Sequence, residues 1–77
     1  MELYVLTRSG TKAIPVLKKS GRDVDANILE YLRMAAGATV EQVADAVNLD
    51  PKTAYDKLRS LSANRWVWRK TTKLVPF

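Results

Sequence analysis

Hydrophobic residues recur at helical spacing through the middle of the chain. Between residues 23 and 35 the apolar positions fall on one stripe: Val24, Ile28, Leu29, Leu32 and Ala35. Two later stretches repeat this period, with inward faces made by Val40, Val43, Ala44 and Val47 and then by Ala54, Leu58 and Leu61. The pattern therefore predicts three consecutive amphipathic helices.

Polar residues mark where the first two of these helices begin and end. Asp23 or Asp25 is expected to cap the first helix, and Gly37 to end it in the left-handed conformation. Thr39 opens the second helix, and Gln42 three residues later completes a capping box.

A tight turn is predicted between the second and third helices. Asn48 tolerates a positive φ, Leu49 is apolar and turns into the core, and Asp50 caps the third helix. Pro51 then occupies the first helical position, where a missing N–H costs nothing. We expect this helix to run to about Ala63.

The pattern changes at both ends of the chain. Leu3 to Thr7 is predicted to form a short strand ended by Arg8-Ser9-Gly10. Thr11 is then expected to cap a helix that runs to about Lys19. Pro15 weakens that helix, so a β-hairpin over residues 3–17 is the competing interpretation. After Asn64 the period alternates, which predicts strands at 66–70 and 73–77 joined around Thr71-Thr72.

The predicted fold is mainly α with a small β component and forms one domain over residues 1–77. Residues 1–22 form an N-terminal strand and short helix, 23–64 a three-helix core and 65–77 a C-terminal β-hairpin. Three helices followed by a hairpin, with a tight turn before the third helix, is the element order of a winged helix-turn-helix.

Charge is distributed in blocks along the chain. Residues 1–22 carry five basic side chains against one acidic (+4), and residues 23–50 carry one against six (−5). Residues 51–77 carry seven against one (+6), which gives the net +5. A basic C-terminal part suggests a polyanionic partner for that part.

Composition narrows the range of functions. The chain has no cysteine, hence no disulfide framework or thiolate metal site, and no histidine, the commonest metal ligand and general base. Asp23 and Asp25 have no neighbouring acid–base partner, so we expect no enzyme, no metal and no cofactor. With neither a signal peptide nor an apolar run of roughly 20 residues, we expect a cytoplasmic protein away from membranes.

The segment from Thr39 to Leu61, continuing through Asn64 to Arg69, resembles the winged helix-turn-helix transcription regulators of bacteria and archaea, broadly those like MarR, ArsR and Lrp. The resemblance covers residues 23–77. Asn48 stands where glycine is commonest, Asn64-Arg65 where a glycine usually precedes the wing, and Trp66 where leucine is usual. Residues 6–17 look like a strand-to-helix segment that MarR-like proteins place after the wing; here it comes first.

The resemblance implies a transcription regulator that binds double-stranded DNA as a homodimer, with helix 51–63 in the major groove and the wing at 69–73 on the backbone or in the minor groove. The implied DNA-binding residues are Lys52, Thr53, Tyr55, Asp56, Arg59, Arg69, Lys70, Thr71, Thr72 and Lys73. The implied dimer interface consists of Tyr4, Ala13, Ile14, Val16 and Leu17.

Other functions fit the same pattern. A winged helix can dock onto a larger protein assembly, and an exposed Trp68 would favour that function. Non-specific or architectural binding of nucleic acid, including RNA, would also use the basic residues. Competition between duplex DNA and RNA separates these two ligands, because an A-form groove does not admit a helix.

Overall fold

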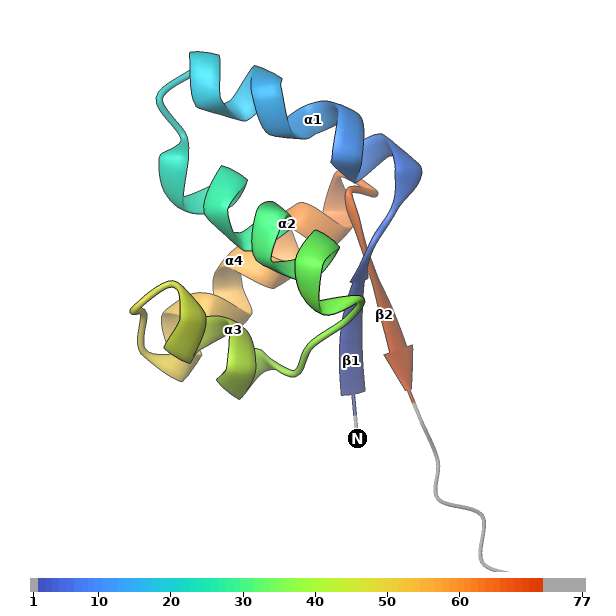
Figure 1. Ribbon diagram of the computed structural model, residues 1–77. Coiled ribbons are helices and arrows are strands. Elements are labelled where there is room, and N and C mark those ends of the chain that lie inside the picture. Colours follow the sequence, from blue (N-terminus) through green and yellow to red (C-terminus); the bar gives the residue numbers. More distant parts are fainter. Residues whose placement is uncertain (1, 72–77) are drawn as a thin grey trace, which may run out of the picture.

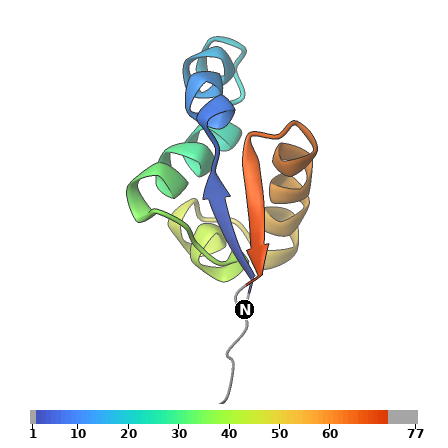
Figure 2. The same ribbon diagram turned by 90° about the vertical axis from the view of Figure 1, so that its right-hand side faces the viewer.

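The computed structural model describes residues 2–71 and is mainly helical with a small antiparallel sheet (Figure 1). The elements follow in the order β1 (Glu2–Leu6), α1 (Arg8–Lys19), α2 (Asp23–Ala35), α3 (Val40–Ala46), α4 (Pro51–Ala63) and β2 (Val67–Thr71). Figure 2 looks onto the sheet, with the two strands in front and the helices behind and beside them.

The three predicted helices 23–63 are confirmed, together with the N-caps of α3 and α4. The Thr39 hydroxyl accepts a hydrogen bond from the backbone N–H of Gln42 at 3.2 Å, and the Gln42 side chain accepts one from the N–H of Thr39 at 3.0 Å. Asp50 caps α4 and Pro51 is its first residue, as predicted. The local sequence therefore determines where α3 and α4 begin.

At α2 the structure corrects three expectations. The N-cap residue is Arg22. Asp23 and Asp25 both lie in the first turn of α2, where their negative charges interact favourably with the helix dipole but do not cap the helix. The left-handed residue at the C-terminus is Ala36 (φ 58°), one position before Gly37. On the apolar stripe, Ala35 and Val24 are exposed, and Ala26 is buried instead.

Residues 8–19 form a helix, so the competing hairpin over residues 3–17 is wrong. The helix starts four residues earlier than predicted because Thr7, not Thr11, caps it: the Thr7 hydroxyl accepts a hydrogen bond from the N–H of Gly10 at 3.0 Å. Pro15 lies inside α1.

A close backbone contact holds the start of α1 against the turn between α4 and β2. A Cβ on Gly10 would lie 2.1 Å from the carbonyl oxygen of Trp66, so only glycine fits there. Thr7 strengthens the contact by donating hydrogen bonds to the carbonyl oxygens of Trp66 (from N–H, 3.1 Å) and Arg65 (from its hydroxyl, 2.7 Å). Arg8-Ser9-Gly10 thus begins a helix instead of forming the loop expected from its sequence.

The sheet pairs the two ends of the chain. β2 runs antiparallel to β1, with Leu6 opposite Val67, Tyr4 opposite Arg69 and Glu2 opposite Thr71. On the other edge of β1, Tyr4 forms an isolated antiparallel bridge with Ala38. β1 thus lies between Ala38 and β2, a pairing that the sequence analysis did not foresee. The predicted second hairpin strand at 73–77 lies outside the described residues.

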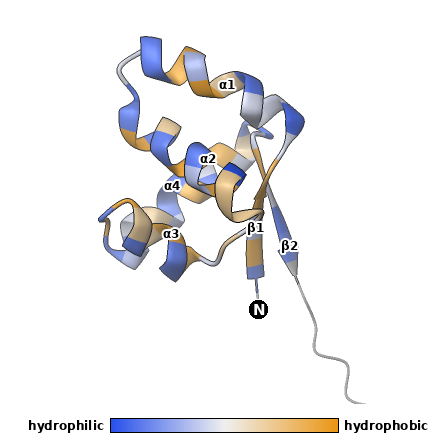
Figure 3. Ribbon diagram, in the orientation of Figure 1, coloured by the Kyte–Doolittle hydropathy of each residue, from blue (hydrophilic) through white to orange (hydrophobic). Residues whose placement is uncertain are grey.

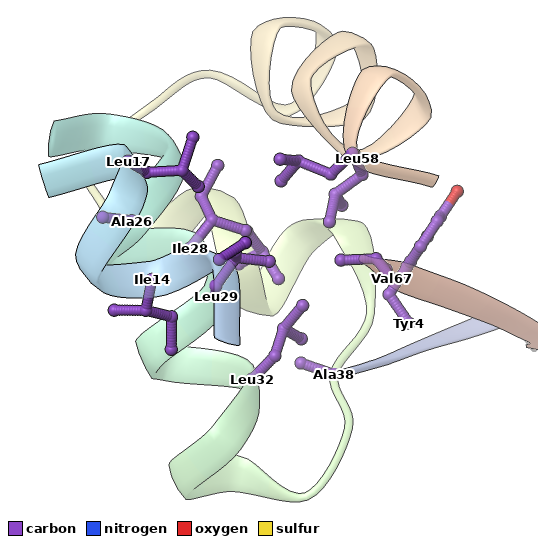
Figure 4. Packing of buried hydrophobic residues seen from close by; sticks show 13 residues of the cluster. Tyr4, Ile14, Leu17, Ala26, Ile28, Leu29, Leu32, Ala38, Leu58 and Val67 are labelled. Atoms are coloured by element: carbon purple, nitrogen blue, oxygen red, sulfur yellow. The ribbon is translucent and has the colours of Figure 1, made fainter. Parts of the chain in front are cut away.

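The hydrophobic core draws on all four helices and both strands (Figure 4). Four of the five residues expected at a dimer interface belong to it: Tyr4, Ala13, Ile14 and Leu17. These side chains are buried within the chain, and Val16 alone of the five is exposed. The N-terminal segment is thus part of the core, because a chain of this size needs the additional apolar burial.

No helix within residues 2–71 is long and apolar enough to cross a membrane.

Candidate nucleic-acid interface

The first turn of α4 is held by its cap. The Asp50 carboxylate accepts hydrogen bonds from the Thr53 backbone N–H at 3.2 Å and from the Thr53 hydroxyl at 2.6 Å. These hydrogen bonds lower the pKa of Asp50, because they stabilise its ionised form. The start of α4 is therefore fixed by hydrogen bonds between residues close in the sequence and does not depend on a tertiary contact.

The turn from α3 sets how α4 crosses it. Asn48 adopts φ 58°, as predicted, and the N–H of Leu49 donates to the carbonyl oxygen of Ala44 at 2.8 Å. Leu49 is half-buried and packs against the core, as the sequence suggested. Ala54, Leu58 and Leu61 then bury one side of α4, which leaves its other sides to solvent and neighbouring elements.

One exposed stripe of α4 faces the sheet side of the molecule. Tyr55, Arg59 and Ser62 follow one another at helical spacing, adjacent to the buried stripe. The Arg59 guanidinium lies over the Tyr55 ring, 6.0 Å from its centroid. The aromatic face supports the guanidinium and leaves its edge, with the N–H donors, free for a ligand.

Together, α4 and the sheet form an open hollow. It is lined by Tyr4 from β1, Arg59, Ser62 and Ala63 from α4, and Trp68 and Arg69 from β2. Figure 4 shows Tyr4 at the edge of the core with its hydroxyl pointing away from the aliphatic side chains. Two arginines from different elements therefore line one hollow, beside a tyrosine that is 1% exposed.

The groups around the Tyr4 hydroxyl shift its pKa in opposite directions. Burial raises the pKa of the Tyr4 hydroxyl and the Glu2 carboxylate adds to the rise, whereas Arg69 opposes it. Arg69 is also near Glu2, with 3.9 Å between a guanidinium nitrogen and a carboxylate oxygen. Both side chains are about half exposed, so this pair is weak and leaves Arg69 available.

On the opposite flank of α4 a basic residue has a structural contact. Asp25, whose side chain is 5% exposed, accepts from Nε of Arg22 at 2.8 Å and lies 2.7 Å from its Nη2. Lys57 of α4 approaches the other oxygen of Asp25 at 3.7 Å. The Arg22 guanidinium also lies 5.9 Å from the centroid of the Trp66 ring. This network joins the start of α2 to the middle of α4.

The structure brings some of the predicted DNA-binding residues together and leaves others apart. Tyr55, Arg59 and Arg69 meet at or beside the hollow, whereas the Thr53 hydroxyl is engaged in the cap. Three more are exposed on the outer side of α4 and on β2: Lys52, Asp56 and Lys70. Thr71 ends β2, and Thr72 and Lys73 lie outside the described residues.

Sequence reasoning missed Ser62 and Tyr4 as residues of this site. Ser62 could have been found, because it lies three positions after Arg59 and seven after Tyr55 on one helical stripe. Tyr4 carried no such signal, since its place depends on the pairing of the first strand with the last.

Trp68 lines the hollow and is largely exposed to solvent. Its neighbour Val67 is buried, whereas Trp68 itself is 65% exposed. Its partner in the register is Val5, which is half-buried. Trp66 is partly buried and packs against the core.

Hydropathy separates the two strands. β1 is largely hydrophobic, whereas the end of β2 is hydrophilic (Figure 3).

The residues described include no cluster of three or more acidic side chains that could hold a metal ion. Comparison of this chain with protein-family models, with curated proteins and with solved structures finds no match, so its function has to be argued from this geometry.

Proposed function

We propose that this protein binds double-stranded DNA as a winged helix-turn-helix, with α4 in the major groove and the end of β2 on the sugar-phosphate backbone. The observation that carries the proposal is the convergence of Arg59 on α4 and Arg69 on β2 at one open hollow. A protein that binds DNA needs cations that reach along the duplex from more than one element.

The helix pair supports this function. α3 and α4 are joined by a tight turn with Asn48 at positive φ, and α4 exposes polar residues along the sides that the core does not cover. Lys52 lies in the first turn of α4, and Tyr55 and Arg59 follow on the flank next to β2. A helix carrying such side chains is suited to the width of the major groove.

The wing in this proposal is built from both ends of the chain. In MarR-like regulators the strand-to-helix segment follows the wing, whereas here β1 and α1 come first in the sequence. Because β1 lies beside β2, it takes the place of the second wing strand. The tip of the wing then lies where Glu2 and Thr71 are paired, and Lys70 is exposed beside it.

Selection of bound sequences from random duplex DNA tests the proposal, followed by fluorescence anisotropy on an enriched duplex at increasing salt. We expect the logarithm of the affinity to fall linearly with the logarithm of salt concentration. Arg59→Ala should weaken binding about tenfold, the loss of roughly one good contact. Arg33→Ala, which removes an exposed arginine from α2, serves as the matched control and should bind like the wild type.

The selection also reports the number of copies that bind. A palindromic consensus indicates two copies related by a two-fold axis, and a single half-site indicates one. Equal affinity for every duplex reduces the function to non-specific or architectural binding, and no binding even at low salt contradicts the proposal.

The exposed Trp68 favours a second candidate function, a winged helix that docks onto a partner protein. Trp68 is 65% exposed on the sheet, where the half-buried Leu3 and Val5 continue the apolar surface. Large exposed aromatic side chains are typical anchors of protein interfaces. If the wild type binds DNA and Trp68→Ala binds it equally well, Trp68 does not contact the duplex and is free for such a partner. If Trp68→Ala loses DNA binding, Trp68 belongs to the DNA interface.

A further inference from the structure

We propose that the hollow between α4 and β2 is a phosphate subsite, in which Arg59, Arg69 and the hydroxyls of Tyr4 and Ser62 hold one backbone phosphate of the bound duplex. The inference rests on the proposed DNA-binding function and specifies which group of the duplex occupies this part of the surface.

The residues that line the hollow carry several hydrogen-bond donors. Arg59 and Ser62 reach it from one side, on α4, and Tyr4 and Arg69 from the other, on paired positions of β1 and β2. Guanidinium groups bind phosphate through two N–H donors at once, and hydroxyls donate to the remaining oxygens. None of these four side chains is a carboxylate, so the hollow itself does not repel an anion.

The supporting contacts hold these donors in place before a ligand binds. The Tyr4 ring is packed in the core (1% exposed), so its hydroxyl has little freedom to move. Arg59 is stacked against Tyr55, which restricts its guanidinium. Pre-positioned donors lose little conformational entropy on binding, which is what a small anion site on an open surface requires.

Glu2 is the one carboxylate that faces this group among the described residues. It lies 3.9 Å from Arg69 and raises the pKa of Tyr4, so it competes with a phosphate for the same donors. Removing its charge should strengthen binding, an effect that misfolding cannot imitate.

The experiment measures affinity and its salt dependence with the full chain and an enriched duplex. Tyr4→Phe and Ser62→Ala each remove one hydroxyl and should weaken binding about fivefold. Arg69→Ala should lower the slope of log affinity against log salt by about 1. Glu2→Gln should strengthen binding about two- to threefold. Tyr31→Phe and Ser60→Ala, which remove hydroxyls from α2 and from another side of α4, are the matched controls and should bind like the wild type.

A second measurement separates this inference from the proposed function. Inorganic phosphate is titrated into the free protein while the amide signals of Tyr4, Ser62 and Arg69 are followed by NMR. If the wild type binds duplex but Tyr4→Phe and Ser62→Ala bind equally well, the subsite is wrong and the DNA-binding function stands. If no duplex binds, the proposed function is wrong. Phosphate-induced shifts of the amide signals that disappear in Arg69→Ala would then support the anion site on their own. If phosphate causes no such shifts, the subsite is wrong as well.

Discussion

The two flanks of α4 carry basic residues in opposite situations. On one flank Lys57 lies 3.7 Å from the buried carboxylate of Asp25, which Arg22 also contacts. On the other flank Arg59 lies at an open hollow with Arg69, and within residues 2–71 no carboxylate lies within ion-pair distance of Arg59. Residue type and sequence distance do not distinguish these two cations; their neighbours in space do.

The difference shows that the two flanks of α4 have different roles. A cation that is satisfied by a buried carboxylate fixes the position of the helix, because separating the pair leaves a buried charge. A cation supported by an aromatic ring but lacking a carboxylate keeps its attraction for an external anion. We therefore expect mutations on the Asp25 flank to change stability and those on the Arg59 flank to change binding.

The largest effect on stability should come from Asp25→Ala. The change leaves Arg22 and Lys57 without their buried partner, and we expect a loss of about 2 kcal/mol, limited by the partial exposure of both cations. Asp23→Ala is the matched control, because Asp23 lies in the same first turn of α2 but is exposed; it should cost only a few tenths of a kcal/mol. Urea unfolding followed by circular dichroism measures both, and equal losses would contradict a structural role of the Asp25 pair.

A smaller effect is expected from Lys57→Ala, which is to be compared with Arg59→Ala. Lys57 is 42% exposed and its pair is long, so its removal should cost about 0.5 kcal/mol of stability and leave DNA affinity unchanged. Arg59→Ala should show the reverse, with the tenfold loss of affinity given above and a change in stability within about 0.5 kcal/mol. Two variants that both lose affinity, or both lose stability, would remove the distinction between the flanks.

The smallest expected effect on stability concerns Asp50, which caps the start of α4. The hydrogen bonds from Thr53 hold the pKa of Asp50 below its usual value of 3.8. A carboxylate with a lowered pKa in the folded state contributes stability that is present above the unfolded pKa and is lost as the pH falls through the folded pKa. Asp50 therefore stabilises the folded state above pH 3.8, and this contribution is lost as the pH falls further.

NMR titration of the Asp50 carboxyl carbon tests this directly. Thr53→Ser keeps the hydroxyl and should leave the pKa of Asp50 low, whereas Thr53→Ala should raise it, because the hydroxyl hydrogen bond is its largest cause. An unchanged pKa in Thr53→Ala would show that the backbone N–H alone accounts for the effect.

Much of the three-helix part could be predicted from local signals. Thr39 with Gln42, Asn48 and the pair Asp50-Pro51 each act within a few residues, and the structure confirms all of them. The buried stripe of α4 at Ala54, Leu58 and Leu61 follows from its period. Errors of one to four residues appear where two local signals compete, as at Thr7 and Thr11 or at Ala36 and Gly37.

The arrangement of the two chain ends depended on the tertiary structure. β1 and β2 are separated by four helices, and no periodicity in either strand says that they pair. The same pairing places Tyr4 beside Arg69 and turns four expected interface residues into core.

The sequence by itself determined the helices α2 to α4, the N-caps of α3 and α4 and the turn before α4, because those features arise from backbone hydrogen bonds and φ preferences of neighbouring residues. Only the tertiary structure decided that Gly10 meets the carbonyl of Trp66, that Lys57 meets Asp25 and that Arg59 does not meet a carboxylate. These contacts join residues that are distant in the chain, so they depend on how the elements pack together and not on local sequence preferences.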